Sequence, residues 1–133
     1  MPHYRASEVA ALLGVSDDTV RRWIDAGRLT AGRDGAGRYV VAGAELAAFA
    51  RDQAHPAQVE GLRASSARNR LAGLVTRVER DGVMAQVDIQ AGPFRLVSLL
   101  SREAADEMGL EPGVLVVASV KSTNVVVEMG EHA

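Results

Sequence analysis

The spacing of apolar residues divides the chain into a helical first part and a β-rich second part. In the first part, apolar residues recur at helical spacing between Ser7 and Leu13, and again at Val20, Trp23 and Ile24. In the second part, short runs rich in valine and leucine alternate with turn residues, which is typical of strands. The sequence therefore predicts an α+β protein of two domains.

The first part predicts a helix-turn-helix followed by a hairpin. Gly14 ends the first helix, and the Ser16 side chain can cap the second. Two β-prone runs, residues 28–30 and 38–41, flank a glycine-rich tip and predict the strands of a wing. A last apolar run at residues 44–50 predicts a helix that covers the first two. The tip is not a nucleotide-binding loop, because no Gly-Lys-Ser or Gly-Lys-Thr follows it.

Residues 4–52 resemble the winged helix-turn-helix of the MerR and excisionase group. The resemblance rests on these segments: Gly14-Val15-Ser16, Thr19-Val20-Arg21-Arg22-Trp23, Gly27-Arg28-Leu29 and Leu46-Ala47-Ala48-Phe49. It implies binding to double-stranded DNA, with the second helix in the major groove and the wing on the backbone.

The residues expected to contact DNA are mostly arginines of the second helix and the wing. They are Arg5, Asp18, Thr19, Arg21, Arg22, Arg28, Arg33 and Arg38. Asp18 is included because a carboxylate can accept a hydrogen bond from cytosine N4. An alternative stays open, since Asp17 with Arg21 and Asp18 with Arg22 stand four residues apart and can form surface ion pairs instead.

The second part predicts five strands, at residues 74–78, 83–89, 94–100, 114–120 and 125–128. Ser101 can cap a short helix between the third and fourth strands. Five strands with one helix in this position predict a C-terminal five-stranded OB-like β-barrel.

Two donor-rich turns lie at the ends of these apolar runs. One is Ser66-Ala67-Arg68-Asn69-Arg70-Leu71-Ala72-Gly73, and the other is Val120-Lys121-Ser122-Thr123-Asn124-Val125. Both offer hydroxyl, amide, cationic and backbone N–H donors, and neither carries a carboxylate. Such a pair of turns suits a small, fully deprotonated anion.

The two turns, with Leu110-Glu111-Pro112-Gly113 between them, resemble the molbindin or Mop domain, over roughly residues 65–130. The resemblance implies that molybdate or tungstate is bound where subunits of a homo-oligomer, a dimer or hexamer, meet. The site it implies consists of Ser66, Ala67, Arg68, Asn69 and Ser101, with Lys121 and Ser122 from a neighbouring subunit. The chain departs from the family at Ala104, where serine is common.

Each of these residues also has an ordinary structural interpretation. Arg68 can pair with a carboxylate of the barrel, Asn69 can hold a turn, and Lys121 can be a solvated cation at the end of a strand. The occurrence of both motifs in order favours the anion site.

Composition narrows the range of functions. The chain has no cysteine, which excludes disulfides, thiolate metal sites and cysteine nucleophiles, and its three scattered histidines lack metal-ligand spacing. No run is apolar and long enough to span a membrane, so we expect a cytoplasmic protein. No catalytic constellation or cofactor motif is present, and we expect no enzyme and no cofactor besides the oxyanion ligand.

Net charge is −2, and neither half is a basic block: residues 1–55 carry 7 arginines against 7 acidic residues. DNA binding would therefore depend on a local array of arginines, and a single copy should bind weakly.

These features predict a molybdate- or tungstate-responsive transcriptional regulator. Its parts would be a winged helix-turn-helix at 1–52, a linker at 53–65 and a molbindin-like domain at 66–133. One alternative is a molybdate or tungstate storage protein whose N-terminal domain is an interaction module. Another is a DNA-binding protein whose barrel only oligomerises.

Overall fold

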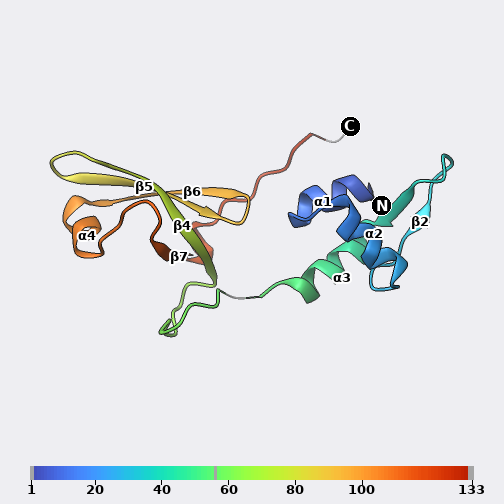
Figure 1. The fold of residues 1–133 in the computed structure, drawn as a ribbon, viewed down its shortest axis with the longest axis horizontal. Coiled ribbons are helices and arrows are strands. Elements are labelled where there is room, and N and C mark those ends of the chain that lie inside the picture. The colour runs from blue at the N-terminus through green and yellow to red at the C-terminus, as the bar shows by residue number, and fades with distance from the viewer. Residues whose placement is uncertain (1, 56, 132–133) are drawn as a thin grey trace. The chain divides into compact units, whose positions relative to one another are not determined.

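The computed structural model describes residues 2–55 and 57–131 and divides into two compact units, residues 1–55 and 56–133 (Figure 1). The first unit contains β1 (His3–Arg5), α1 (Ala6–Leu13), α2 (Asp17–Asp25), β2 (Gly32–Arg33), β3 (Tyr39–Ala42) and α3 (Gly43–Gln53). Its three strands form an antiparallel sheet in the order β1-β3-β2. The predicted helix-turn-helix with a wing is confirmed.

The turn between the first two helices follows the predicted chemistry. Gly14 adopts a left-handed conformation with φ 68°, which only glycine adopts without a steric penalty. The Ser16 hydroxyl then accepts a hydrogen bond from the Thr19 amide at 3.1 Å, and so caps α2. Glycine and serine together fix where one helix ends and the next begins.

The strands of this unit differ from the prediction in two places. The first wing strand lies at β2, rather than at residues 28–30, because the Arg28 and Leu29 amides both donate to the Trp23 carbonyl. This holds the segment against the end of α2. Strand β1, which pairs His3 with Ala42, was not predicted.

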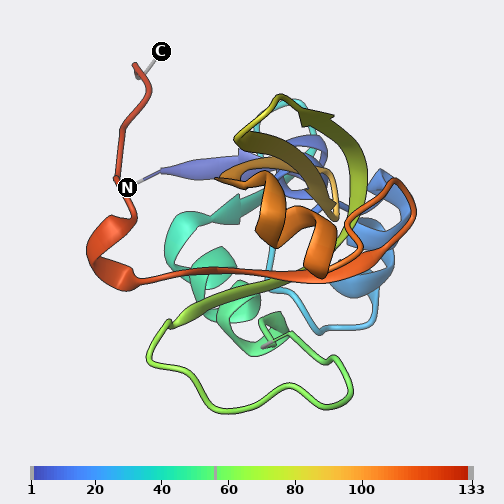
Figure 2. The ribbon, with the colours of Figure 1, turned by 90° about the vertical axis from the view of Figure 1, so that its left-hand side faces the viewer.

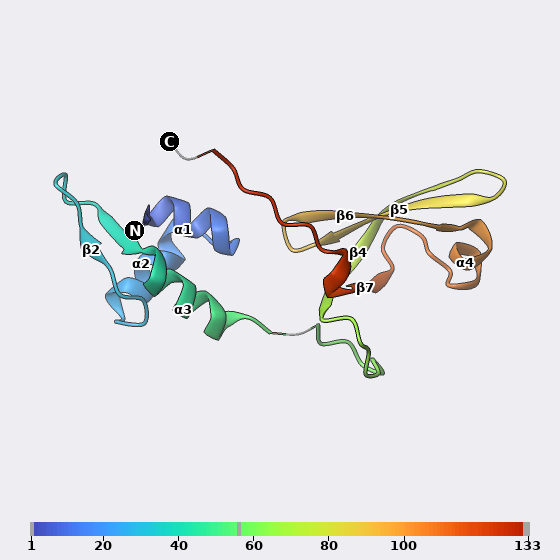
Figure 3. The same ribbon diagram turned by 180° about the vertical axis from the view of Figure 1, so that it is seen from behind.

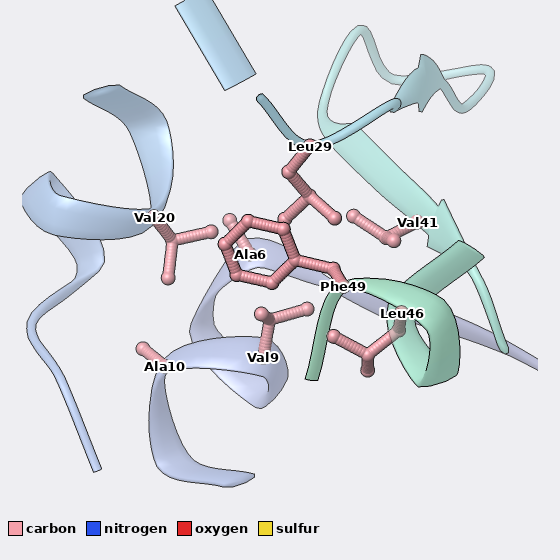
Figure 4. Packing of buried hydrophobic residues seen from close by; sticks show 8 residues of the cluster. All are labelled: Ala6, Val9, Ala10, Val20, Leu29, Val41, Leu46 and Phe49. Atoms are coloured by element: carbon pink, nitrogen blue, oxygen red, sulfur yellow. The ribbon is translucent and has the colours of Figure 1, made fainter. Parts of the chain in front are cut away.

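The core of this unit gathers one to three apolar side chains from each helix, together with Leu29 and Val41. Phe49 of α3 lies among Val9, Val20, Leu29 and Val41 (Figure 4). Full burial of side chains of this size stabilises a fold by about 1.5–3 kcal/mol each. These contacts hold α2 and the wing on one small scaffold.

The second unit is a curled antiparallel sheet with one short helix (Figure 2). It contains β4 (Asn69–Arg80), β5 (Met84–Ala91), β6 (Phe94–Ser101), α4 (Arg102–Glu107), β7 (Leu115–Val120) and the 3₁₀ turn η1 (Ser122–Asn124). The strand order is β6-β5-β4-β7. The predicted OB-like fold and the helix capped by Ser101 are confirmed.

The long strand β4 makes the curl possible. Its first half pairs with β7 and its second half with β5, and the register shifts between Val75 and Arg77. Gly73 lies where β4 crosses closest to β5: a Cβ atom there would stand 2.6 Å from Ile89 Cγ2. The absence of a side chain at this position is therefore required by packing.

The prediction of a fifth strand at residues 125–128 is wrong, because these residues form no strand within a single chain. The structure shows an open coil after η1, in which Val126 and Val127 are 82% and 86% exposed (Figure 3). A strand needs a neighbour for its backbone N–H and C=O groups, and the described part of this chain supplies none. The sheet of the second unit accordingly has four strands.

Candidate functional site

The pairing of β4 with β7 brings the two donor-rich turns to the same end of the sheet. Asn69, the first residue of β4, is the register partner of Val120, the last residue of β7. The Asn69 side chain also donates from Nδ2 to the Val120 carbonyl at 3.0 Å. Segments 51 residues apart in sequence are thus joined where the first turn enters the sheet and the second leaves it.

The first turn presents its polar side chains outward. Ala67 is buried, and its amide donates to the Ser65 hydroxyl at 3.1 Å. Ser66 and Arg68, on either side of Ala67, are exposed and have no side-chain hydrogen bond in the described part of the chain. The turn is therefore anchored by Ala67, while Ser66 and Arg68 can reach a ligand.

The second turn contains the single lysine of the chain, Lys121. Its backbone carbonyl accepts a hydrogen bond from the Asn124 amide at 2.9 Å, which closes η1. Lys121 and Ser122 are both exposed. Within one chain the turn thus holds an ammonium group and a hydroxyl beside the Asn69 end of β4, whereas the family resemblance implies that Lys121 and Ser122 contact the anion from a neighbouring subunit.

Ser101 does not join this group within one chain. It pairs with Met84 at the start of β5, next to the end of β4 that is opposite Asn69. Its hydroxyl accepts a hydrogen bond from the Ala104 amide at 3.0 Å. A site that includes both Ser101 and Asn69 would have to take them from different copies of the chain.

A second polar surface lies in the first unit, where a hollow of about 390 Å³ separates the wing from the start of α1 and from α2. Four of the arginines expected to contact DNA line it, namely Arg5, Arg21, Arg33 and Arg38. Asp17 and Tyr39 also face it. The fold therefore brings together the local array of arginines that the sequence predicts.

Three of these arginines are already engaged within the unit. Arg5 pairs with Glu8 at 3.3 Å, and Arg38 pairs with Asp34 at 3.1 Å. The Arg33 guanidinium donates to the Gly37 carbonyl at 2.7 Å and lies over the ring of Tyr39. Arg21 makes no side-chain hydrogen bond or ion pair in the described part of the chain, so its guanidinium is available to a ligand.

Arg22 is held differently from Arg21. It donates to the Thr19 hydroxyl at 3.2 Å, and that hydroxyl shares a 2.9 Å hydrogen bond with Ser16. Neither Asp17 with Arg21 nor Asp18 with Arg22 comes within ion-pair distance in the described residues, so this alternative is not what the structure shows.

Asp18 and Arg28, the remaining residues expected to contact DNA, are both exposed and lie outside the lining of the hollow.

Two sets of contacts between ionisable side chains were not predicted from the sequence. Tyr39 donates to Asp25 Oδ1 at 2.9 Å, which joins the wing to the end of α2. Asp88, a buried carboxylate on β5, accepts hydrogen bonds from Gln86 and from Arg95, the latter at 2.9 Å. Gln86 lies two residues from Asp88 on β5, but Arg95 reaches Asp88 from β6, and Tyr39 reaches Asp25 from another element. The pairing of β5 with β6 and the packing of the wing bring these last two pairs together.

The described residues contain no cluster of three or more histidine or acidic side chains able to hold a metal ion. No helix among them is long and apolar enough to cross a membrane.

Comparison with known proteins assigns a family to each unit. The family model of the TOBE domain matches residues 65–127, and that of a helix-turn-helix domain matches residues 4–54. Molybdenum-pterin-binding protein 2 of Clostridium pasteurianum is 36% identical over 63 residues, which are 47% of this chain and 93% of that protein. The chain belongs to the molbindin family.

Solved structures are similar to the molbindin domain of this chain. A molybdate-binding protein from Sporomusa ovata is 28% identical, with a TM-score of 0.49, and the match covers 50% of this chain and 100% of that one. The cytoplasmic molybdate-binding protein ModG is 36% identical, with a TM-score of 0.47, over 53% of this chain and 50% of that one. In this chain the molbindin domain is joined to a helix-turn-helix domain.

Proposed function

We propose that this protein is a molybdate- or tungstate-responsive transcriptional regulator. Its molbindin domain binds the oxyanion, and its helix-turn-helix unit binds double-stranded DNA. It acts in the cytoplasm as a homo-oligomer and catalyses no reaction. The observation that carries the proposal is the register of Asn69 with Val120, which places the two donor-rich turns side by side.

The donor set suits a tetrahedral dianion. Ser66, Arg68, Asn69, Lys121 and Ser122 offer hydroxyl, guanidinium, amide and ammonium donors, and neither turn contains a carboxylate that would repel the anion. Hydrogen bonds to a charged group contribute roughly 1.5–3 kcal/mol each. Five or six of them, after the cost of desolvating the ligand, are consistent with about 8 kcal/mol, which is micromolar affinity.

Two features of the molbindin domain support assembly with further copies. Ser101 lies at the far end of the sheet from Asn69, so the predicted site is complete only when a second copy contributes to it. A groove of about 300 Å³ between β6 and β7 is lined largely by apolar side chains, and the valine-rich segment after η1 is unpaired. Exposed apolar surface of this kind favours association.

Assembly would also strengthen DNA binding. A single helix-turn-helix unit with four arginines around one hollow makes few phosphate contacts, and its charge is otherwise balanced. Two units on one oligomer engage two half-sites, and the second binds at high effective concentration. An oxyanion bound between copies would change how those units are presented, which couples the ligand to DNA binding.

One observation favours a second candidate, an intracellular molybdate or tungstate storage protein. The matched segment makes up 93% of the Clostridium pasteurianum relative, so a protein of this family can consist of little more than this domain. In a storage protein, the N-terminal unit would serve as a protein-interaction module.

Isothermal titration calorimetry with molybdate, tungstate and sulfate tests the proposed ligand. The proposal predicts micromolar or tighter binding of molybdate or tungstate and much weaker binding of sulfate. If none of the three anions gives heat and the melting temperature is unchanged, the barrel binds no oxyanion and its role is oligomerisation alone. Tight oxyanion binding with no DNA binding under any condition would support the storage protein.

A further inference from the structure

The wing is connected to the second helix of the helix-turn-helix by one tyrosine. Tyr39, the first residue of β3, donates its phenolic hydrogen to Asp25, the last residue of α2, at 2.9 Å. The same ring packs against the core of the unit and carries the Arg33 guanidinium 4.2 Å from its centre. Asp25, Tyr39 and Arg33 thus form a continuous chain of contacts from α2 to the wing.

The other side-chain contacts of the wing lie within its tip, while β3 at its root pairs with β1 and contributes Val41 to the core. Asp34 accepts hydrogen bonds from the Ala36 and Arg38 amides at 2.9 Å and pairs with the Arg38 guanidinium. The Arg38 amide, together with that of Ala36 and the Arg38 side chain, keeps the pKa of the Asp34 carboxyl below its usual value. The turn is therefore rigid by itself, and its orientation depends on the strands beneath it.

We propose that Tyr39 is a positioning residue for DNA: its bond to Asp25 fixes the wing, and with it Arg33, at a set distance from the recognition helix α2. The inference rests on the proposed DNA-binding function. The Tyr39–Asp25 hydrogen bond explains how the wing is positioned, which the arginines by themselves do not explain.

The chemistry of the three groups supports this role. The hydrogen bond that Tyr39 makes to Asp25 raises the pKa of the phenol, so the donor hydrogen is retained throughout the physiological range. The Tyr39 ring face attracts the Arg33 guanidinium, and the Gly37 carbonyl accepts its hydrogen bond. Arg33 is therefore held in the hollow that Arg21 also lines before DNA arrives, which reduces the ordering cost of binding.

The test uses the full chain and a fluorescein-labelled DNA duplex of mixed sequence, with anisotropy measured over a series of KCl concentrations. Tyr39→Phe keeps the ring and the stacked arginine but removes the bond to Asp25. We expect DNA affinity to fall about fivefold at low salt, the effect of one hydrogen bond. We also expect a shallower salt dependence, by roughly one phosphate contact, because the wing, with Arg33 still stacked on the ring, is no longer tied to α2.

Two matched variants separate this role from a general loss of structure. Tyr4→Phe removes the hydroxyl from another half-buried ring on the same core, one that is not hydrogen-bonded to Asp25, and should bind DNA as the parent does. Asp25→Ala and Asp25→Asn both remove a negative charge, yet only asparagine keeps an acceptor for Tyr39. The asparagine variant should therefore bind DNA about fivefold more tightly than the alanine variant.

A double-mutant cycle with Arg33 gives the decisive outcome. If Tyr39 acts through Arg33, Tyr39→Phe should have no further effect in an Arg33→Ala background. Parent-like binding by Tyr39→Phe, or full additivity with Arg33→Ala, would overturn the inference while leaving DNA binding itself intact. Failure of the parent protein to bind any duplex would instead overturn the proposed function and this inference with it. Should Tyr39→Phe fail to fold, the two Asp25 variants carry the same test.

Discussion

The Asn69 side chain donates to the backbone carbonyl of Val120 at 3.0 Å, directly across the junction of β4 and β7. This contact joins the turn that carries Ser66 and Arg68 to the turn that carries Lys121. A turn-holding role and a ligand-binding role are therefore not alternatives for Asn69. The same amide group that fixes the two turns also forms part of the donor-rich surface between them.

Replacement of Asn69 should weaken both the fold and the site. Asn69→Ala removes one half-buried hydrogen bond, which should lower the free energy of unfolding by about 1 kcal/mol. Asn69→Asp has the same shape but cannot donate, and it adds a negative charge where the anion would bind. We expect the aspartate variant to lose molybdate binding in calorimetry even at a temperature where it is fully folded. Micromolar binding by Asn69→Asp would remove this residue from the site.

In the proposed site Lys121 would supply the ammonium group, and as the single lysine it can be followed selectively. Lys121→Ala should weaken oxyanion binding by about 2 kcal/mol or more, because a charge-assisted hydrogen bond is lost. The melting temperature without ligand should stay unchanged, since the side chain is exposed. Reductive ¹³C-methylation gives an NMR signal for this amine that molybdate should shift. An unchanged calorimetric affinity in the alanine variant would refute the assignment.

The sequence was most informative where a single local cause decides the structure. Ser16 and Ser101 cap helices as predicted, and Gly14 forms the turn, because each acts on backbone groups within a few residues. The prediction of a strand at residues 125–128 was wrong, because a β-prone run needs a partner strand that the sequence pattern alone does not locate.

For the site, too, local features could be predicted from the sequence and long-range contacts could not. The two turns could be recognised from residue type and order, but their adjacency depends on the register of β4 against β7. The position of Ser101 at the far end also depends on register. Tyr39 was missed because its partner Asp25 lies 14 residues away on another element, and no local pattern connects the two.

Gly73 should be the most sensitive glycine of the barrel. A Cβ atom there would meet Ile89 Cγ2 at 2.6 Å and the Gln90 carbonyl at 2.9 Å, so β4 and β5 would have to separate. Gly73→Ala should lower the free energy of unfolding by roughly 1–3 kcal/mol. Gly82→Ala, where a Cβ meets open space, is the matched control and should unfold in urea much as the parent does. Equal unfolding midpoints for the two variants would contradict the packing described here.

We expect Arg21 to contribute to DNA binding and not to oxyanion binding. It lines the hollow beside the wing and makes no side-chain hydrogen bond or ion pair among the described residues, so it can bind a phosphate without breaking one. Arg21→Ala should weaken DNA binding and lower the slope of log affinity against log salt by about 0.9. Arg51→Ala, an exposed arginine in the last turn of α3 and outside the hollow, should change little. Equal losses in both variants would point to net charge as the only cause. Oxyanion affinity should be the same in both.

The Asp88 carboxyl should make the barrel sensitive to acid. Hydrogen bonds from Gln86 and Arg95, and the charge of Arg95, keep its pKa below the usual value. Because the folded-state pKa is lowered, the stabilisation is present above the unfolded pKa of about 4 and is lost as pH falls through the folded value. Asp88→Asn should therefore be less stable at neutral pH and show a weaker loss of stability below about pH 4. Identical pH profiles of the melting temperature would exclude this contribution.

The central claim is that oxyanion binding in one unit changes DNA binding by the other. The most direct measurement is a selection of duplexes from a random-sequence pool by the full chain, followed by affinity measurements on the selected DNA with and without saturating molybdate. The account predicts a sequence-specific duplex whose affinity changes about fivefold or more with molybdate, and a Lys121→Ala variant that has lost this response but still binds the DNA. Identical DNA affinity with and without molybdate, in a protein that binds both ligands, would contradict it.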